Sequence, residues 1–389
     1  MTTEIRPAHS PLGASGAERW MNCPGSVALL KQLYIPEETD EPDYRSEGTT
    51  AHEAAAHCLK TGEETFELIG RQFEKHKVSQ EMADAIGMYV RECLSLIASG
   101  DTVLIEQGIA APDFHPDFYG TVDFSVFKAT TKTLYIRDFK YGIGIAVDAE
   151  DNPQLMYYAY GLLRRNPEAE EIDMGIVQPR AFHPDGPIRA WRITAKDLCA
   201  WAEETLLPSM IATAMESDLD AGSWCRFCLA KLVCPLQEAL FGAATTADPK
   251  KLIELTDGSL GRSYQYIAAV KQYIKALEEE VFRRLMGGAP IEGTKLVNKK
   301  ANRVWKPEAE NILMVTFGDR AYEPASLKSP AEIAKMGEDA KALVTQYAYT
   351  PQSDLTVALA SDRRAAVPPP KPEAFTDFIS GDNTDSKQV

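Results

Sequence analysis

Residues 120–140 read GTVDFSVFKATTKTLYIRDFK, and this stretch decides the expected fold. Two runs rich in β-branched and aromatic residues flank a short polar segment, which predicts two antiparallel strands joined by a turn. If the turn is centred between Thr130 and Thr131, Asp123 and Asp138 lie directly opposite each other, with Cβ atoms about 5 Å apart. Lys140 lies two residues beyond Asp138 on the same strand, so both side chains point to one face.

Two opposed carboxylates beside a lysine are typical of a metal-dependent hydrolytic site. The carboxylates repel each other strongly unless positive charge lies between them. A hard cation such as Mg²⁺ or Mn²⁺ suits such oxygen ligands, and Lys140 would orient or activate a water molecule for phosphodiester hydrolysis. The alternative is an exposed, charged hairpin face without a chemical role, since Asp-x-Lys recurs by chance in most proteins.

A histidine follows a glycine in the sequence Gly48-Thr-Thr-Ala-His52. We expect His52 in the first turn of a helix that begins near Thr50, because Thr50 and Glu53 have the spacing of a capping box. Its neutral imidazole is a candidate metal ligand, and the alternative is a histidine satisfied by solvent. His57 lies about 140° away around that helix, which excludes the histidine pair of a zinc protease.

A second helix is predicted to open at Asn152-Pro153, with the asparagine as N-cap and the proline at the first helical position. Gln154 and Tyr158 are four residues apart and therefore share one face of this helix. They are candidate contacts for a phosphate or a base. The alternative is a half-buried stripe of polar and aromatic residues.

Helical and strand patterns alternate along the rest of the chain. We expect helices over about 15–33, 79–99, 195–215 and 262–286, and strands over 102–106, 172–178 and 188–193. A basic segment from Lys295 to Lys306, predicted to be a hairpin, offers possible DNA contacts at Lys299, Lys300, Arg303 and Trp305.

Composition indicates a soluble intracellular protein. The 389 residues are 44% hydrophobic and 25% charged, as is usual for a packed globular chain. There is no apolar run long enough to span a membrane and no secretory signal, so we expect a cytoplasmic location. The net charge of −16 argues against a surface that is basic all over, but it does not exclude DNA as a substrate.

Seven cysteines are better interpreted as thiols or metal ligands than as disulfides in a reducing compartment. Three of them, Cys225, Cys228 and Cys234, stand close together, and Cys23 lies some two hundred residues upstream. Cys58, Cys93 and Cys199 fall in helical stretches and are expected to be core thiols.

In order, four short patterns resemble the motifs of the PD-(D/E)XK nuclease superfamily, specifically its RecB-like branch. They are Gly48…His52, Gly120…Asp123, Asp138-Phe-Lys140 and Gln154…Tyr158. The resemblance covers about residues 10–240. It implies an α/β (α+β) restriction-endonuclease-like core, with a central mixed sheet flanked by helices, and metal-dependent DNA cleavage. The implied metal ligands are His52, Asp123, Asp138 and the main-chain carbonyl of Phe139, and the implied catalytic residues are Asp123, Asp138, Lys140, Gln154 and Tyr158.

The cysteine spacing is similar to that of the iron-sulfur members of this branch, the AddB-type helicase-nucleases and the CRISPR-associated nucleases. This resemblance implies a [4Fe-4S] cluster held by Cys23, Cys225, Cys228 and Cys234. Proline follows both Cys23 and Cys234, which fits the habit of iron-sulfur ligands. A structural zinc in the same four thiolates is the main alternative.

The chain also resembles a family of bacteriophage proteins that share this nuclease core, which would place the protein in a bacterial host cell. The leading hypothesis is a DNA exonuclease that resects ends for recombination or repair, with a single-strand annealing or other recombination protein as partner. Oligomerisation stays open. A structure-selective endonuclease and a non-catalytic DNA-binding or assembly subunit are the alternatives. We expect a nuclease domain over 1–245, a helical and hairpin accessory region over 246–363 and a disordered tail over 364–389.

Overall fold

The computed structural model describes residues 10–33, 43–215, 218–246 and 256–295. The chain divides into two compact units, Met1–Ile291 and Glu292–Val389, and the architecture below is that of the first. The predicted DNA contacts Lys299, Lys300, Arg303 and Trp305 and the predicted tail lie outside the described residues. In the described part of the chain, no helix combines the length and the apolar character needed to cross a membrane.

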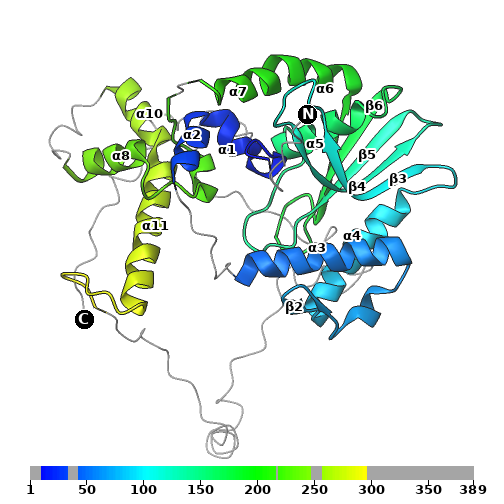
Figure 1. The fold of residues 1–389 in the computed structure, drawn as a ribbon, viewed down its shortest axis with the longest axis horizontal. Helices are drawn as coiled ribbons and strands as arrows, with labels where there is room; N and C mark the ends of the chain where they lie inside the picture. The colour runs from blue at the N-terminus through cyan, green and yellow to red at the C-terminus, as the bar shows by residue number, and fades with distance from the viewer. Residues whose placement is uncertain (1–9, 34–42, 216–217, 247–255, 296–389) are drawn as a thin grey trace, which may run out of the picture. The chain divides into compact units, whose positions relative to one another are not determined.

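A five-stranded mixed sheet forms the centre of the first unit (Figure 1). Its strands lie in the spatial order β3 (Thr102–Ala110), β4 (Tyr119–Lys128), β5 (Thr133–Phe139), β6 (Glu171–Val177) and β7 (Ile188–Thr194). Neighbouring strands are antiparallel, except that β5 and β6 are parallel and are joined by the crossover helix α5 (Pro153–Leu163). The predicted α/β class, a central mixed sheet flanked by helices, is confirmed.

The register between β4 and β5 is the one predicted from the sequence. Phe124 pairs with Arg137 and Lys128 pairs with Thr133, so the turn is centred between Thr130 and Thr131. The ladder ends at the Phe124–Arg137 pair. Beyond it, the main-chain N–H of Phe139 donates to Asp123 Oδ2 at 2.8 Å, which brings Asp123 against the strand that carries Asp138.

Helices cover both faces of the sheet, and each face has its own apolar core. On one face, α5 packs with α1 (Ala17–Asn22), α6 (Ala195–Trp201) and α7 (Leu207–Ala212). On the other face lie α3 (Asp43–Thr61) and α4 (Gln80–Ser95) (Figure 1). Short elements complete this part: η1 (Ala14–Gly16), η2 (Thr65–Leu68), and a hairpin of β1 (Gln72–Phe73) and β2 (His76–Lys77).

The start predicted for the helix that carries His52 is wrong. Helix α3 begins at Asp43, so both Thr50 and His52 lie inside it rather than at its first turn. Thr50 is buried, and its hydroxyl donates to the carbonyl of Phe73 at 3.0 Å instead of capping the helix. The tertiary contact with the β1–β2 hairpin thus takes the hydroxyl that a capping box would use.

Two other predicted helix starts are confirmed by their caps. The hydroxyl of Ser79 accepts a hydrogen bond from the N–H of Met82 at 3.1 Å at the start of α4. Asn152 accepts from the N–H groups of Gln154 and Leu155 at the start of α5. These short polar side chains satisfy donors that a first helical turn leaves free.

The helix predicted over 195–215 is interrupted. A π-helical turn, η3 (Ala202–Leu206), separates α6 from α7. Pro208 has no N–H to donate to the carbonyl four residues earlier, and its ring crowds that carbonyl. A local change in helical winding accommodates this proline without breaking the run.

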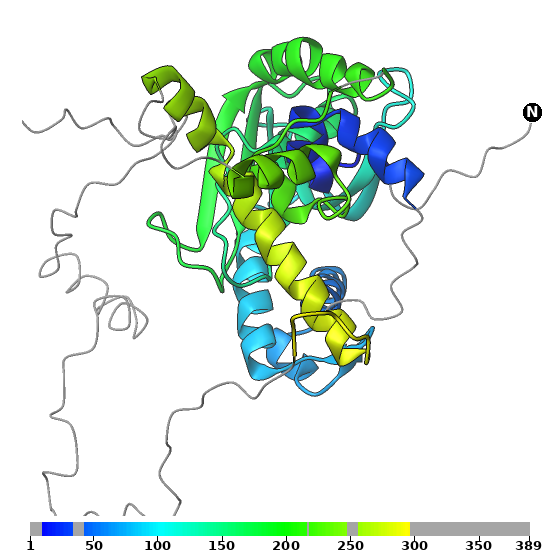
Figure 2. The same cartoon turned by 90° about the vertical axis from the view of Figure 1, so that its left-hand side faces the viewer.

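The helix predicted over 262–286 is also two helices, α10 (Asp257–Gln265) and α11 (Ile267–Met286), with Tyr266 between them. Figure 2 shows α11, in yellow, running past α8 (Pro235–Thr246), and α11 also contacts η4 (Ser223–Phe227). The residues that α11 buries are Ala269 and Ala276, whereas Ile267, Ile274 and Leu277 of the expected apolar stripe remain exposed.

A buried arginine on β5 connects the sheet to helix α4 through an ion pair. Arg137 on β5 donates from Nε to Glu92 of α4 at 2.7 Å and from Nη1 to Asp173 of β6 at 2.8 Å. Asp173 also accepts from Arg192 on β7. The guanidinium lies over Gly175, where an added Cβ would stand 2.9 Å from Arg137 Cδ, so this glycine makes room for the ion pairs.

Candidate metal centre and active site

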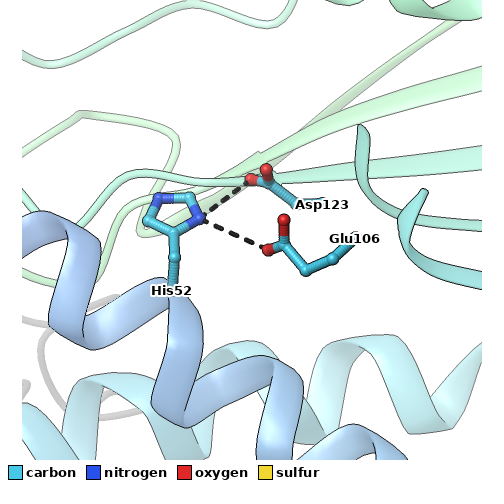
Figure 3. A group of neighbouring side chains, drawn as sticks. All are labelled: His52, Glu106 and Asp123. Carbon is cyan, nitrogen blue, oxygen red and sulfur yellow. Dashed lines mark ion pairs between the residues drawn. The ribbon is translucent and has the colours of Figure 1, made fainter. Parts of the chain in front are cut away.

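Three potential metal ligands converge where the middle of β3 and β4 faces α3 (Figure 3). His52 Nδ1 lies 3.5 Å from Asp123 Oδ2 and 3.9 Å from Glu106 Oε1. One ligand atom from each residue lies within 4.8 Å of the other two, and no other group of three His, Cys, Asp or Glu residues in the described part of the chain meets this condition. An imidazole and two carboxylates at this separation are donors that a hard divalent cation can bind together.

An irregularity in strands β3 and β4 brings these ligands to α3. Val122 packs in the core beside α5, but Phe124, two residues further on, packs in the core beside α3 and α4. Residues two apart on a regular strand face the same side, so the strand changes faces at Asp123. Glu106, between the pairs Ile105–Phe124 and Gln107–Val122, has φ of 49°.

This change of face explains why Asp123 lies near both His52 on α3 and the main chain of Phe139 on β5. In a regular strand, Asp123 would point to the same side as Asp138, toward α5. The irregular backbone turns Asp123 toward His52 on α3 instead, while the main-chain N–H of Phe139 still donates to it. Glu106 sits in the left-handed region, which is unfavourable for a residue with a side chain and is often retained at functional sites.

Asp138, Lys140 and Gln154 form a second group that adjoins the first. Lys140 Nζ donates to Gln154 Oε1 at 2.9 Å, and Gln154 Nε2 donates to Asp138 Oδ1 at 2.9 Å. Lys140 Nζ is also 2.9 Å from Asp138 Oδ2, but the alignment is too poor for a hydrogen bond, so this buried oxygen has no well-aligned donor among the described residues. Its lone pairs remain available to a cation.

Burial and mutual repulsion shape the charges of the site. Burial, followed by the charge of Asp123, raises the pKa of Glu106 to about 7. Burial also raises the pKa of Asp138, although the Lys140 ammonium opposes the rise. The phenol of Tyr158 has a raised pKa because it is buried, with the carboxylates of Asp138 and Asp123 adding to the effect. A bound cation would relieve this accumulation of negative charge.

The structure thus gathers the candidates taken from the four sequence motifs. His52 and Asp123 lie in one group, Asp138, Lys140 and Gln154 lie in the other, and the ring of Tyr158 lies over Gly120 of the second motif. Asp138 is outside the group of three ligands. The carbonyl of Phe139 stays a predicted ligand, since only its N–H has an assigned contact to the site.

Sequence reasoning missed Glu106. It belongs to no recognised short motif, and it lies in a strand for which no pairing partner was predicted. The hairpin register places Glu106 opposite Asp123, because Ile105 pairs with Phe124 and Gln107 with Val122. An acidic residue in a strand next to Asp123 was therefore the available signal.

An open groove of about 590 Å³ leads away from the metal ligands along α3. His52 and Glu106 form one end of it, and Lys60 lies one turn beyond His57 along the helix. The complete lining is Thr49, His52, Glu53, Ala56, His57, Lys60, Phe73 and Glu106. Two of the three metal ligands, His52 and Glu106, are therefore reachable from solvent through this groove.

The four cysteines singled out in the sequence line one cavity at the other end of the unit. Cys23 lies between α1 and α2 (Gly25–Gln32), Cys225 and Cys228 lie in and after η4, and Cys234 directly precedes α8. The N–H of Asp220 donates to Cys23 Sγ at 3.3 Å. Cys58 and Cys93 are instead buried in the core beside α3 and α4, while Cys199 is partly buried against the opposite core.

A family profile with the description "Protein of unknown function (DUF2800)" matches residues 9–365. The chain belongs to the DUF2800 family. The match includes the sheet, the metal ligands and all four cysteines of the cavity.

Among solved structures, this DUF2800 chain is similar to a protein from Eubacterium rectale whose crystal structure is described as "Putative exonuclease". The sequence identity is 12% and the TM-score is 0.32, with 57% of this chain and 90% of that chain covered. A likeness of this size carries no argument about the activity of the DUF2800 chain.

Proposed function

We propose that this DUF2800 protein is a metal-dependent deoxyribonuclease that hydrolyses phosphodiester bonds, acting as an exonuclease. The observation that carries the proposal is the junction of a His52–Glu106–Asp123 ligand group with the Asp138–Lys140–Gln154 group. The sequence resemblance to RecB-like PD-(D/E)XK nucleases supports DNA as the substrate. It also supports the exonuclease mode.

The residues present fit a hard divalent cation, Mg²⁺ or Mn²⁺. One imidazole nitrogen and two carboxylates converge, and Asp138 adds a buried oxygen without a well-aligned donor. His52, Glu106 and Asp123 would hold the cation, with Asp138 and the carbonyl of Phe139 as further proposed ligands. When bound, such a cation polarises a phosphoryl oxygen and lowers the pKa of bound water.

The protein's own groups position the reactants around that centre. Asp138 and Gln154 both contact the Lys140 ammonium. These two contacts fix a positively charged hydrogen-bond donor beside the carboxylates. From there, Lys140 would orient the attacking water or the phosphoryl oxygen. Gln154 links Lys140 to Asp138 and serves as a positioning residue, and the buried ring of Tyr158 lies against Gly120.

The groove along α3 is proposed as the approach for the phosphate backbone of the substrate. It starts at the metal ligands His52 and Glu106. Lys60 lies in the same lining and is close enough to lower the pKa of Glu106 by its charge. An ammonium at this point would attract a phosphate group that follows the scissile one.

We further propose that the four-cysteine cavity holds a metal centre of its own, with a [4Fe-4S] cluster favoured over zinc. The resemblance of the cysteine spacing to the iron-sulfur members of the RecB-like branch supports the cluster, and zinc in the same four thiolates is the alternative. Four buried or half-buried thiols in one cavity are a suitable donor set for such a cluster.

A cleavage assay tests the proposed function. Anaerobically purified protein is stripped with EDTA and then incubated with Mn²⁺ or Mg²⁺ and with end-labelled linear or closed circular DNA. Metal-dependent degradation of linear DNA alone supports the exonuclease. Cutting of circles would show an endonuclease, and binding without cutting would show a non-catalytic subunit.

The matched variants are Lys140→Met and Lys132→Met. Lys140→Met should lower cleavage by about 10²-fold or more, because it removes a preorganised charge at the reacting centre. Lys132 lies in the β4–β5 turn, is exposed and pairs with Glu170, so its substitution should leave cleavage unchanged. Equal cleavage by wild type and Lys140→Met would refute the proposed site.

A bacteriophage source, cytoplasmic location and a recombination partner such as an annealing protein remain predictions from the sequence resemblance and composition. The structure-selective endonuclease remains the alternative activity. Neither choice changes the assignment of ligands, because both activities would use the same metal centre.

A further inference from the structure

The cavity that contains the four cysteines holds two polar side chains that the sequence did not single out. Arg19 on α1 and Gln237 on α8 both line it. Arg19 comes before Cys23 in the chain, and Gln237 lies in the first turn of the helix that follows Cys234.

Gln237 is a buried amide without a hydrogen-bonding partner. Its residue is 1% exposed, and neither Nε2 nor Oε1 has a partner among the described residues. The amide lies close to Cys225, where it opposes the rise that burial causes in the pKa of that thiol, but its alignment is not that of a hydrogen bond. A buried amide with both ends unsatisfied is unfavourable, so an apolar residue would suit the metal-free cavity better.

Arg19 is a half-buried cation without a carboxylate partner. Within the described residues, no Asp or Glu oxygen lies within ion-pair distance of it, and its Nη1 donates a hydrogen bond to the hydroxyl of Ser26 at 2.5 Å. Burial lowers the pKa of Arg19, while negative charge on Cys228 and Cys23 would act in the opposite direction. A half-buried guanidinium in this position requires a negative charge nearby.

We infer that Gln237 and Arg19 form the outer shell of a thiolate metal centre in this cavity, with the Gln237 amide donating to a cysteine sulfur and Arg19 balancing the net negative charge. Four thiolates carry a charge of −4, which exceeds that of one Zn²⁺ or of a [4Fe-4S]²⁺ core by two. The N–H of Asp220, which donates to Cys23 Sγ, adds a third donor. Outer-shell donors of this kind fix ligand geometry and raise metal retention.

This inference depends on the proposed metal centre at the cysteines but not on nuclease activity, and its test measures metal retention and stability only. Full-length protein is loaded in one arm with equal amounts of Fe²⁺ and Fe³⁺ and with sulfide under anaerobic conditions, and in the other with Zn²⁺ alone. Metal content, the absorbance near 400 nm and the rate of metal release to a chelator are then compared for wild type, Gln237→Leu and Arg19→Met.

The two variants should release metal about 10- to 100-fold faster than wild type. Gln237→Leu should also have the opposite effect on the metal-free protein and raise its Tm, because the leucine removes an unsatisfied buried amide. A residue that only fills space would shift the Tm of loaded and metal-free protein in the same direction.

Gln265→Leu on α10 is the matched control, since Gln265 is exposed and lies outside the cavity. It should alter neither metal release nor Tm. The inference is overturned if wild type retains metal in neither arm, if Gln237→Leu releases metal as slowly as wild type, or if it destabilises the metal-free protein. The arm in which wild type is loaded identifies the centre as iron-sulfur or zinc.

Discussion

At Glu106, a strained backbone and an unfavourable charge occur in the same residue. Its φ of 49° is uncommon for a residue with a side chain, and its carboxylate lies beside that of Asp123. The metal-free protein bears both costs, and a bound cation would remove the second by offsetting the charge of the two carboxylates. The fold is therefore expected to be more stable with the cation than without it.

Replacing Glu106 by glutamine should stabilise the metal-free protein. The folded-state pKa of about 7 lies above the ordinary value of 4.5. Ionisation of Glu106 therefore lowers the free energy of unfolding progressively as the pH rises from 4.5 to 7. Because the side chain is 31% exposed, solvent screening reduces the gain at pH 8 to about 1–2 kcal/mol. Urea unfolding in EDTA measures it.

The same comparison at pH 4.5 should show a much smaller difference, since Glu106 is then protonated in the folded protein and about half protonated in the unfolded chain. Glu67→Gln is the control, because Glu67 is exposed and lies away from the site. If Glu106→Gln destabilises the metal-free protein at pH 8, the charge of Glu106 does not destabilise the folded state. Added Mn²⁺ should stabilise wild type more than the variant, since the variant has lost a ligand.

Cys58 should resist alkylation in the folded protein. The thiol is buried in α3, and burial, with Glu63 and Glu64 adding to it, raises its pKa from 9.0 to about 11. Because the thiolate is the nucleophile, iodoacetamide at pH 8 should modify Cys58 at least about tenfold more slowly than the same cysteine in urea. Peptide mass spectrometry distinguishes it from the other thiols. Rapid modification before unfolding would show that this part of α3 opens.

Most residues of the candidate site could be named from the sequence. Asp123 and Asp138 could be placed together because the β4–β5 turn is short and fixes their register. Glu106 could not be found in the same way, because the change of strand face at Asp123 depends on packing against both helix layers. No local pattern in the strand encodes it.

At the scale of elements, the Arg137 pairs show how the sheet and α4 are held in register. The guanidinium connects β5 to Glu92 of α4 and to Asp173 of β6, and it can do so because Gly175 has no Cβ. β5 continues from Arg137 to Asp138 and Lys140. Displacement of this arginine should therefore shift Asp138 at the candidate site as well as lower the free energy of unfolding.

Gly175→Ala should destabilise the protein by about 1–3 kcal/mol, because the new methyl would stand 2.9 Å from Arg137 Cδ and overpack the site. Chemical unfolding measures the loss. Gly142→Ala is the control, since a Cβ there meets nothing within 4 Å, and it should change stability by less than about 0.5 kcal/mol. Equal stability of the two variants would mean that Arg137 can move aside freely.

Helices were predictable where local caps decided their ends and not where tertiary contacts did. Ser79 and Asn152 cap α4 and α5 as their sequences indicate. Thr50 has the same chemistry but is used by the carbonyl of Phe73. The packing face of α11 was misjudged for a related reason, because the helix packs against η4 through the small residue Ala269, which shares a core with Cys225.

At the scale of the whole first unit, the cysteine cavity joins the segment before the sheet to the segment that follows it. Cys23 comes before the sheet, and the other three cysteines follow it. A metal centre there would close the structure around the sheet, whereas the cation proposed at His52, Glu106 and Asp123 would lie on a different set of elements. The two centres should therefore be separable by experiment.

Cys23→Ser should lower the Tm of the metal-loaded protein by roughly 5–10 °C, since a loss of about 2–3 kcal/mol shifts the Tm of a domain of this size by about 2–4 °C per kcal/mol. Differential scanning calorimetry measures the shift. Cys199→Ser, which lies outside the cavity, should have a much smaller effect. Removing Mg²⁺ or Mn²⁺ with EDTA should leave the cysteine-bound metal content unchanged, and simultaneous loss of both metals would contradict two separate centres.

The contact between Asp220 and Cys23 spans 197 positions in the chain, and this separation has a consequence for biosynthesis. At a synthesis rate of about 5–20 residues per second, Cys23 precedes its partners by roughly 10–40 s. During that interval, the nascent polypeptide carries an unpaired thiol that oxidants or stray metal ions can capture. The yield of correctly assembled protein in an expression host should thus depend on how long the ribosome takes to complete this interval, and on the redox state of the cell while it does so.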